Sequence, residues 1–206
     1  MTAGLVAGFL VAVFPMIATP GASFTLLVRH VTGGAGAPAA VPVILGTVTG
    51  LQVHATLAAA GLSAVILHAG WAFTALRIAG AAYLIGLGLW TWRAAGASGR
   101  TVERAPAQVA GRGAFLQALL GNVLNPKAAL IFVTLVPQFV HPGRALWPQI
   151  LTLALAQSLL VAVWLGGWAV VITRAGPARL TARFTRTMRR ITAATLITLG
   201  VRTALS

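Results

Sequence analysis

One hydrophobic segment, FLQALLGNVLNPKAALIFVTLVPQFV from Phe115 to Val140, decides the fold. It is long enough to cross a bilayer, because a transmembrane helix needs about 20 mostly apolar residues. Near its middle stand Asn125, Pro126 and Lys127. Proline interrupts the helical hydrogen-bond ladder, and Asn followed by Pro is typical of a helix start. The segment therefore predicts two half-helices that meet near the centre of the membrane.

Five further runs of this kind lie along the chain: Leu5–Val28, Ala39–Leu67, Trp71–Trp92, Trp147–Thr173 and Met188–Leu205. Of the 206 residues, 58% are hydrophobic and only 8% are charged. An ordinary soluble domain is about 25% charged, so too few polar residues remain here to cover six buried soluble helices. We therefore predict an all-α membrane protein with six transmembrane helices and a single domain over residues 1–206.

The first run contains a second interruption. Thr19 and Pro20 again read as an N-cap followed by proline at the first helical position, so a half-helix is expected to restart there. An offset of 106 residues places this pair on Asn125 and Pro126. Helices 1 and 4 are thus predicted to be broken at proline.

The offset divides the chain into two repeats, about 1–93 and 113–206, with three spans each. Because the number of spans per repeat is odd, the copies take opposite orientations, as in many secondary transporters. The intervening residues 94–112 are small, polar and basic, which predicts a flexible cytoplasmic linker.

The distribution of charge predicts the orientation. The chain has 15 Lys and Arg but only one acidic residue, Glu103, so the net charge is +14. With six spans, eleven basic residues fall on one side of the membrane and three on the other. Cytoplasmic loops carry the basic excess, so both termini are expected on the outer face. The anionic inner leaflet explains the charge, and no nucleic-acid partner is expected.

The broken spans predict an anion site. A restarting half-helix exposes free N–H groups and the positive end of its dipole, which bind carboxylates. Lys127 adds a charge in mid-span, where charged residues are by default functional. No acid lies in any span, so a substrate carboxylate is the simplest partner, beside backbone carbonyls. Arg77 is either an interfacial side chain or a secondary contact for the same anion.

Gly46, Gly50 and His54 recur every four residues and share one face of a span. Glycines at this spacing allow two helix backbones to approach closely. His54 is the only histidine in a span core, and it is either a proton carrier or a hydrogen-bonded packing residue. Further polar residues are read as a polar lining or as interhelical hydrogen bonds: Ser23, Gln52, Asn122, Gln138, Gln157 and Ser158.

Several function classes are excluded. The spans contain no carboxylate and the chain has no cysteine, which argues against hard-cation sites and thiolate metal sites. No metal and no cofactor are expected. An intramembrane hydrolase would need Ser23 or Ser158 beside His54, and no nucleophile motif frames either serine. The chain is therefore not expected to be an enzyme.

Several stretches together resemble the lysine exporter (LysE/RhtB) family of amino-acid efflux translocators. They are Ala18–Gly21, Gly46–Gly50 with His54, Leu76–Gly88, Asn122–Phe132, Val136–Phe139 and Leu199–Arg202. The resemblance implies six spans in two inverted halves, and proton-coupled export of amino acids or similar zwitterions from a bacterial cytoplasm across the inner membrane. It also implies core transport positions at Pro20, Gly21, Gly46, Gly50, Asn125, Pro126 and Lys127.

One departure from the family pattern concerns coupling. The first-span motif usually reads Pro-Gly-Pro followed by Asp or Asn, whereas this chain has Pro20-Gly21-Ala22-Ser23. Ser23 can hydrogen-bond an ammonium group, but it cannot accept a proton at neutral pH. His54 is then the leading titratable candidate by elimination.

The resulting hypothesis is an antiporter that exports a small amino acid with a neutral side chain. The predicted substrate-binding residues are Thr19, Pro20, Gly21, Ser23, Gly46, Gly50, Asn122, Asn125, Pro126 and Lys127. The alternative is a non-transporting structural or regulatory membrane subunit, in which the prolines and Lys127 only build a helix interface. The sequence leaves the oligomeric state open, including a homo-oligomer.

Overall fold

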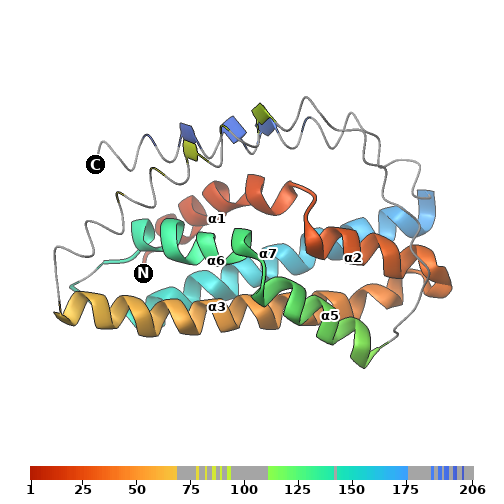
Figure 1. Ribbon diagram of the computed structural model, residues 1–206, viewed down its shortest axis with the longest axis horizontal. Helices are drawn as coiled ribbons and strands as arrows, with labels where there is room; N and C mark the ends of the chain where they lie inside the picture. The colour runs from red at the N-terminus through yellow and green to blue at the C-terminus, as the bar shows by residue number, and fades with distance from the viewer. Residues whose placement is uncertain are drawn as a thin grey trace.

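The computed structural model describes residues 1–68, 111–141 and 143–175, together with isolated positions between 78 and 93 and between 187 and 201. These residues form helices joined by short turns, with no strand in the part described (Figure 1). The elements are α1 (Ala3–Ala18), α2 (Ala22–His30), η1 (Val31–Ala35), η2 (Ala37–Ala39), α3 (Ala40–His68), α5 (Arg112–Val123), α6 (Pro126–Leu130), η3 (Ile131–Leu135), η4 (Val136–Phe139) and α7 (Leu146–Ala175).

Four of the six predicted runs are confirmed as helical segments. Two helices, Ala37–Leu62 and Leu146–Arg174, are long and apolar enough to cross a membrane. Two further pairs pass the same criterion as bent units, Ala3–Ala18 with Ala22–Gly33 and Arg112–Val123 with Lys127–Phe139. The described residues therefore hold two to four candidate spans. The other two predicted runs, Trp71–Trp92 and Met188–Leu205, and most of the predicted linker 94–112 lie outside the described residues.

Side-chain polarity is inverted relative to a soluble protein. Leu57, Leu159 and Val163 are 63%, 67% and 66% exposed, whereas Thr47, Asn122 and Gln157 are 2%, 4% and 1% exposed. A soluble protein buries its large aliphatic side chains and leaves amides and hydroxyls in water. The observed distribution suits helices whose outer surface meets lipid and whose polar groups face inward.

The break between α1 and α2 corrects one prediction. The two helices are bent by 59°, but Thr19 is not the N-cap of the second helix. Its N–H and its hydroxyl both donate to the carbonyl of Pro15, at 3.1 and 2.9 Å, so Thr19 ends α1 instead. Gly21 takes the N-cap position in an extended conformation and α2 begins at Ala22. A threonine hydroxyl readily bonds back to the carbonyl four residues earlier, and this local bond outcompetes capping.

Between α5 and α6 the local backbone geometry matches the expected helix start. The segments on either side are bent by 54°, and Asn125 is the N-cap with Pro126 at the first helical position. The side-chain Oδ1 of Asn125 accepts from the backbone N–H of Lys127 at 3.0 Å. Asn-Pro therefore starts a helix here for the reason expected, since the amide oxygen satisfies one of the free N–H groups.

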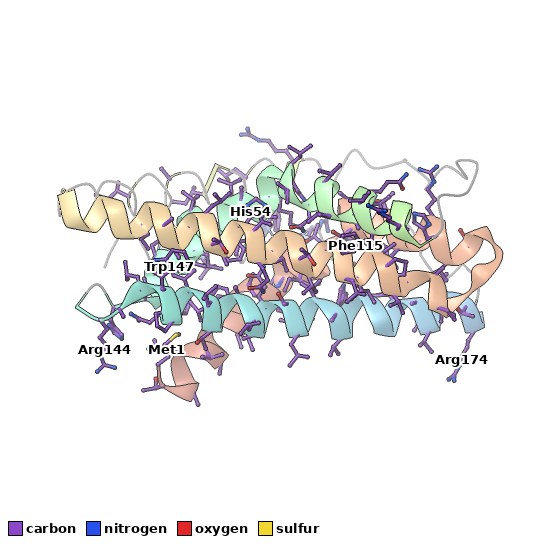
Figure 2. The ribbon with its side chains drawn as sticks, turned by 90° about the horizontal axis from the view of Figure 1, so that it is seen from below. Met1, His54, Phe115, Arg144, Trp147 and Arg174 are labelled. Carbon is purple, nitrogen blue, oxygen red and sulfur yellow. The ribbon has the colours of Figure 1, made fainter. Side chains whose placement is uncertain are left out.

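The long helices α3 and α7 pack side by side and run in opposite directions (Figure 1). Figure 2 shows Trp147 and Arg174 at the two ends of α7, with α3 beside it and Phe115 on α5 across the other face of α3. The shorter pairs are also opposed, because α1 and α2 run against the direction of α5 and α6. The two broken segments thus run in opposite directions along the α3–α7 pair (Figure 1).

The glycines of α3 form the close contact with α5, as predicted. A Cβ added to Gly46 would collide with the carbonyl oxygen of Phe115 and lie 2.9 Å from the Cβ of Ala118. A Cβ on Gly50 would lie 2.8 Å from both Cβ and Oδ1 of Asn122. Glycine is required at both positions because the partner helix occupies the space that a side chain would need.

Candidate functional site

A cavity of about 80 Å³ lies where the two broken segments meet α3 and α7. The cavity is lined by residues on both sides of each break. Thr47 of α3 and Gln157 and Trp164 of α7 complete its wall. Six of the predicted substrate-binding residues lie on its wall: Thr19, Gly21, Ser23, Asn122, Asn125 and Lys127. The chain folds so that positions about 100 residues apart converge on one small space.

Lys127 joins the two breaks across this cavity. Its Nζ donates to the carbonyl oxygen of Met16 and, at 3.4 Å, to that of Thr19. Both carbonyls belong to the end of α1, where backbone oxygens lack intrahelical donors and carry the negative end of the helix dipole. Backbone carbonyls therefore hold the ammonium group, as one sequence-based reading allowed. A lysine ammonium has three N–H donors, so a third remains beyond the two bonds that it makes within the described part of the chain.

The two half-helix starts differ in what they offer. At α6, the N–H of Lys127 bonds to the Asn125 side chain, and the N–H groups of Ala128 and Ala129 bond to the Asn125 carbonyl. The prediction that this start exposes free donors is therefore wrong, because Asn125 satisfies them.

At α2 the first backbone bond runs from Thr25 to Gly21, and Gly21 offers no capping side chain. The N–H groups of Ala22, Ser23 and Phe24 precede that bond and have no intrahelical acceptor. All three residues line the cavity. The open helix start is therefore the one at α2.

Three residues that line the cavity each have a buried polar atom without a hydrogen-bond partner in the described part of the chain. The atoms are Thr47 Oγ1, Asn122 Oδ1 and Gln157 Oε1. Buried polar side chains almost always find a partner, and each exception needs an explanation. The three exceptions come from three helices, α3, α5 and α7, whose residues line one cavity.

Comparison with known proteins identifies the family. The family model of the LysE type translocator matches residues 14–206. The chain belongs to the LysE type translocator family. An uncharacterized membrane protein of Bacillus subtilis (strain 168) is 32% identical over 93% of this chain and 94% of its own length.

Two further relatives of this translocator carry functional names. A homoserine/homoserine lactone efflux protein of Salmonella typhimurium (strain LT2) is 38% identical over 66% of this chain and 65% of its own length. A threonine efflux protein of Escherichia coli (strain K12) is 35% identical over 47% of this chain and 48% of its own length. No solved structure matches the chain. Together with the apolar helices, these matches make the translocator a multi-pass membrane protein.

Three other predicted residues, Gly46, Gly50 and Pro20, are not among the described residues that line the cavity. Gly46 and Gly50 lie in the α3–α5 contact, one layer behind it. Pro20 lies in the first break, and Pro126 is the first residue of α6 at the second break. Arg77 lies outside the described residues.

His54 is a residue of α3 and lies beside the last turn of α5 (Figure 2). It is 7% exposed, its Nε2 donates to the carbonyl of Asn122 at 3.1 Å, and its ring stacks on Phe132 with centroids 6.0 Å apart. Ser158 instead accepts a 2.8 Å bond from Gln52. The bond that the structure gives His54 thus goes to a backbone carbonyl and not to a serine, which disfavours the hydrolase interpretation.

Sequence reasoning did not select Thr47 or Trp164 as site residues of the translocator. Trp164 lines the cavity and makes edge-to-face contacts with Phe14 and Trp168. A helical-face analysis of α7 could have found it, because Gln157, Val161 and Trp164 follow each other at the spacing of one helix face and all line the cavity. Thr47 gave no such signal, since its importance depends on which helices surround it.

Proposed function

We propose that this protein exports a small amino acid from the bacterial cytoplasm across the inner membrane by alternating access. The observation that carries the proposal is the cavity between the two breaks, which combines the Lys127 ammonium, the open start of α2 and three unpartnered buried oxygens. Family membership and the named efflux functions of two relatives support the same conclusion.

The substrate carboxylate docks between Lys127 and the start of α2. The third N–H of Lys127 and the N–H groups of Ala22 and Ser23 offer several donors to one anion. Helix starts and ammonium groups are both suited to carboxylates. Because Asn125 satisfies the α6 start, the anion contact is assigned to α2 alone and not to both half-helices.

The side chain of the substrate is proposed to be neutral. No acidic residue occurs in any predicted span, since the only one, Glu103, belongs to the predicted linker. A second positive charge on the substrate would therefore enter the cavity without a counter-charge, which is costly away from water. Homoserine and threonine, named for two relatives, meet this condition.

The full architecture is proposed to be six spans in two inverted repeats. Adding 106 to the bounds of α3 gives 146–174, and α7 runs from Leu146 to Ala175. The two breaks correspond at the same offset, and the matching helices are antiparallel. Gln52 and Ser158, which are joined by a hydrogen bond, are also 106 residues apart. Contact between equivalent positions is expected where a pseudo-two-fold axis passes.

Both termini are expected on the outer face of the inner membrane. Epitope tags at residues 1 and 206 should bind antibody once the outer surface is made accessible, without disruption of the inner membrane. A tag inserted at Ser98, in the predicted cytoplasmic linker, is the control and should stay protected. Protected termini with an accessible linker tag would reverse the orientation.

The driving force is proposed to be the proton gradient, with His54 as the proton carrier. Its neighbours Asn122 and Phe132 do not titrate. Replacing His54 with glutamine keeps a donor for the Asn122 carbonyl but removes titration. We expect His54→Gln to retain downhill amino-acid exchange in proteoliposomes and to lose stimulation by an imposed pH gradient, while His141→Gln, outside the helices, keeps it. Stimulation that persists in His54→Gln would exclude this role.

Export itself is tested with purified protein in proteoliposomes loaded with homoserine or threonine. Exchange of external labelled amino acid above that of protein-free liposomes is expected for at least one of the two. Absence of exchange with both, from protein that is folded and correctly inserted, would favour the alternative of a non-transporting membrane subunit.

A further inference from the structure

We propose that Thr47, Asn122 and Gln157 together form the binding site for the ammonium group of the substrate, and so select for amino compounds. This inference rests on the proposed export function and deepens it. The family match and the named relatives assign no residue to this group.

The three side chains present matching chemistry. Each is more than nine-tenths buried and lines the cavity, and each has an oxygen without a partner in the described residues. A hydroxyl and two amide oxygens are acceptors, and an alkylammonium group has three N–H donors. An ammonium group therefore has as many donors as these three cavity-lining side chains have unpartnered oxygens.

Neighbouring contacts hold the Asn122 side chain in place, and the helix turn that carries Gln157 is bonded to the opposite helix. The Cβ and Oδ1 of Asn122 pack against Gly50, and its backbone carbonyl accepts from His54. Gln157 precedes Ser158, whose hydroxyl is bonded to Gln52 on the opposite helix. Acceptors that are positioned before the ligand arrives lose less entropy when it binds.

The two amide oxygens, of Asn122 and Gln157, disfavour a carboxylate. Unlike Lys127 and the start of α2, an amide oxygen is an electronegative acceptor and repels an anion. The cavity therefore has one set of groups for the carboxylate and a second set for the ammonium group. The two sets orient an amino acid in one direction within a small space.

Three probes separate the two sets. Homoserine carries both groups, homoserine lactone keeps the ammonium group but has its carboxylate esterified, and 4-hydroxybutyrate keeps the carboxylate but lacks the amine. Each is measured as a competitor of labelled homoserine exchange in proteoliposomes at mildly acidic pH, where the amine is protonated.

Thr47→Val and Gln157→Met remove an acceptor and nearly preserve shape. Each substitution is expected to weaken the binding of homoserine and of homoserine lactone about tenfold in this competition assay. This is the effect of losing one hydrogen bond to a charged group. Competition by 4-hydroxybutyrate should be the same in both variants as in the wild-type protein, including the case in which the wild-type protein shows none. Thr49→Val is the matched control, because Thr49 lies on the same helix, is exposed and bonds to Leu45 within it. It should leave all three probes unchanged.

Each outcome decides the proposal. Weaker competition by homoserine and homoserine lactone, with unchanged competition by 4-hydroxybutyrate, supports the proposed ammonium site. Equal weakening of all three probes, weakening of 4-hydroxybutyrate alone, or no change in either variant would overturn the assignment while export stands. If wild-type protein exchanges neither homoserine nor threonine, the proposed function fails, and this inference fails with it.

Discussion

Replacing Lys127 with methionine is expected to lower homoserine exchange by about 10- to 100-fold. A hydrogen bond to a charged partner contributes about 1.5–3 kcal/mol, and each 1.4 kcal/mol corresponds to a factor of ten. Methionine keeps a long unbranched side chain but neither donates nor carries charge. The loss should appear as weaker homoserine binding in competition assays, with folded protein recovered at wild-type level.

Homoserine lactone is the control ligand for this prediction, because it shares the ammonium group of homoserine but lacks the carboxylate. Homoserine lactone has no carboxylate to lose, so its competition should change far less in Lys127→Met than that of homoserine. Arg174→Gln is the control for charge, because Arg174 is exposed at the far end of α7 (Figure 2). If homoserine and lactone weaken equally, or if the variant is simply not recovered as folded protein while Lys127→Arg is, then the ammonium group only ties α6 to the end of α1.

The second large effect is expected at Gly46, where alanine should destabilise the folded protein. The added methyl group would collide with the backbone oxygen of Phe115, which cannot rotate away as a side chain does. The helices α3 and α5 must then separate, and overpacking of this kind costs about 1–3 kcal/mol. We expect Tm in detergent to fall by about 5 °C or more.

Gly61→Ala is the matched control on the same helix. A Cβ at Gly61 meets nothing within 4 Å, so alanine there should leave Tm unchanged or raise it slightly. Unchanged Tm in Gly46→Ala would mean that α3 and α5 are not held in the close contact described above.

Local sequence signals predicted much of the fold because bilayer thickness and backbone chemistry act over short stretches. The length of the apolar run around Asn125 predicted the helices on either side of it, and the Asn-Pro pair predicted the start of α6. The same logic was wrong at Thr19, because its hydroxyl has a competing acceptor in Pro15. Pro15 itself lies inside α1, so the choice between capping and back-bonding depends on the geometry of the preceding turn.

The site was predictable only in part, since its chemistry depends on which groups remain unsatisfied after folding. Lys127 was found from its charge in an apolar run. Its contact with the end of α1 joins residues more than 100 positions apart and leaves no trace in composition. Thr47 became a candidate only once its hydroxyl proved to be buried without a partner.

The hydrogen bond between Gln52 and Ser158 has a consequence for motion. Under the proposed inverted repeat, alternating access exchanges the conformations of the two halves, and a contact between equivalent positions maps onto itself in that exchange. This point then acts as the fulcrum about which both halves rock. The chain has no native cysteine, so a single disulfide can be engineered at a chosen place. A disulfide between positions 52 and 158 is expected to preserve transport. A disulfide that joins the two halves elsewhere is expected to hold the protein open to one side and to stop transport.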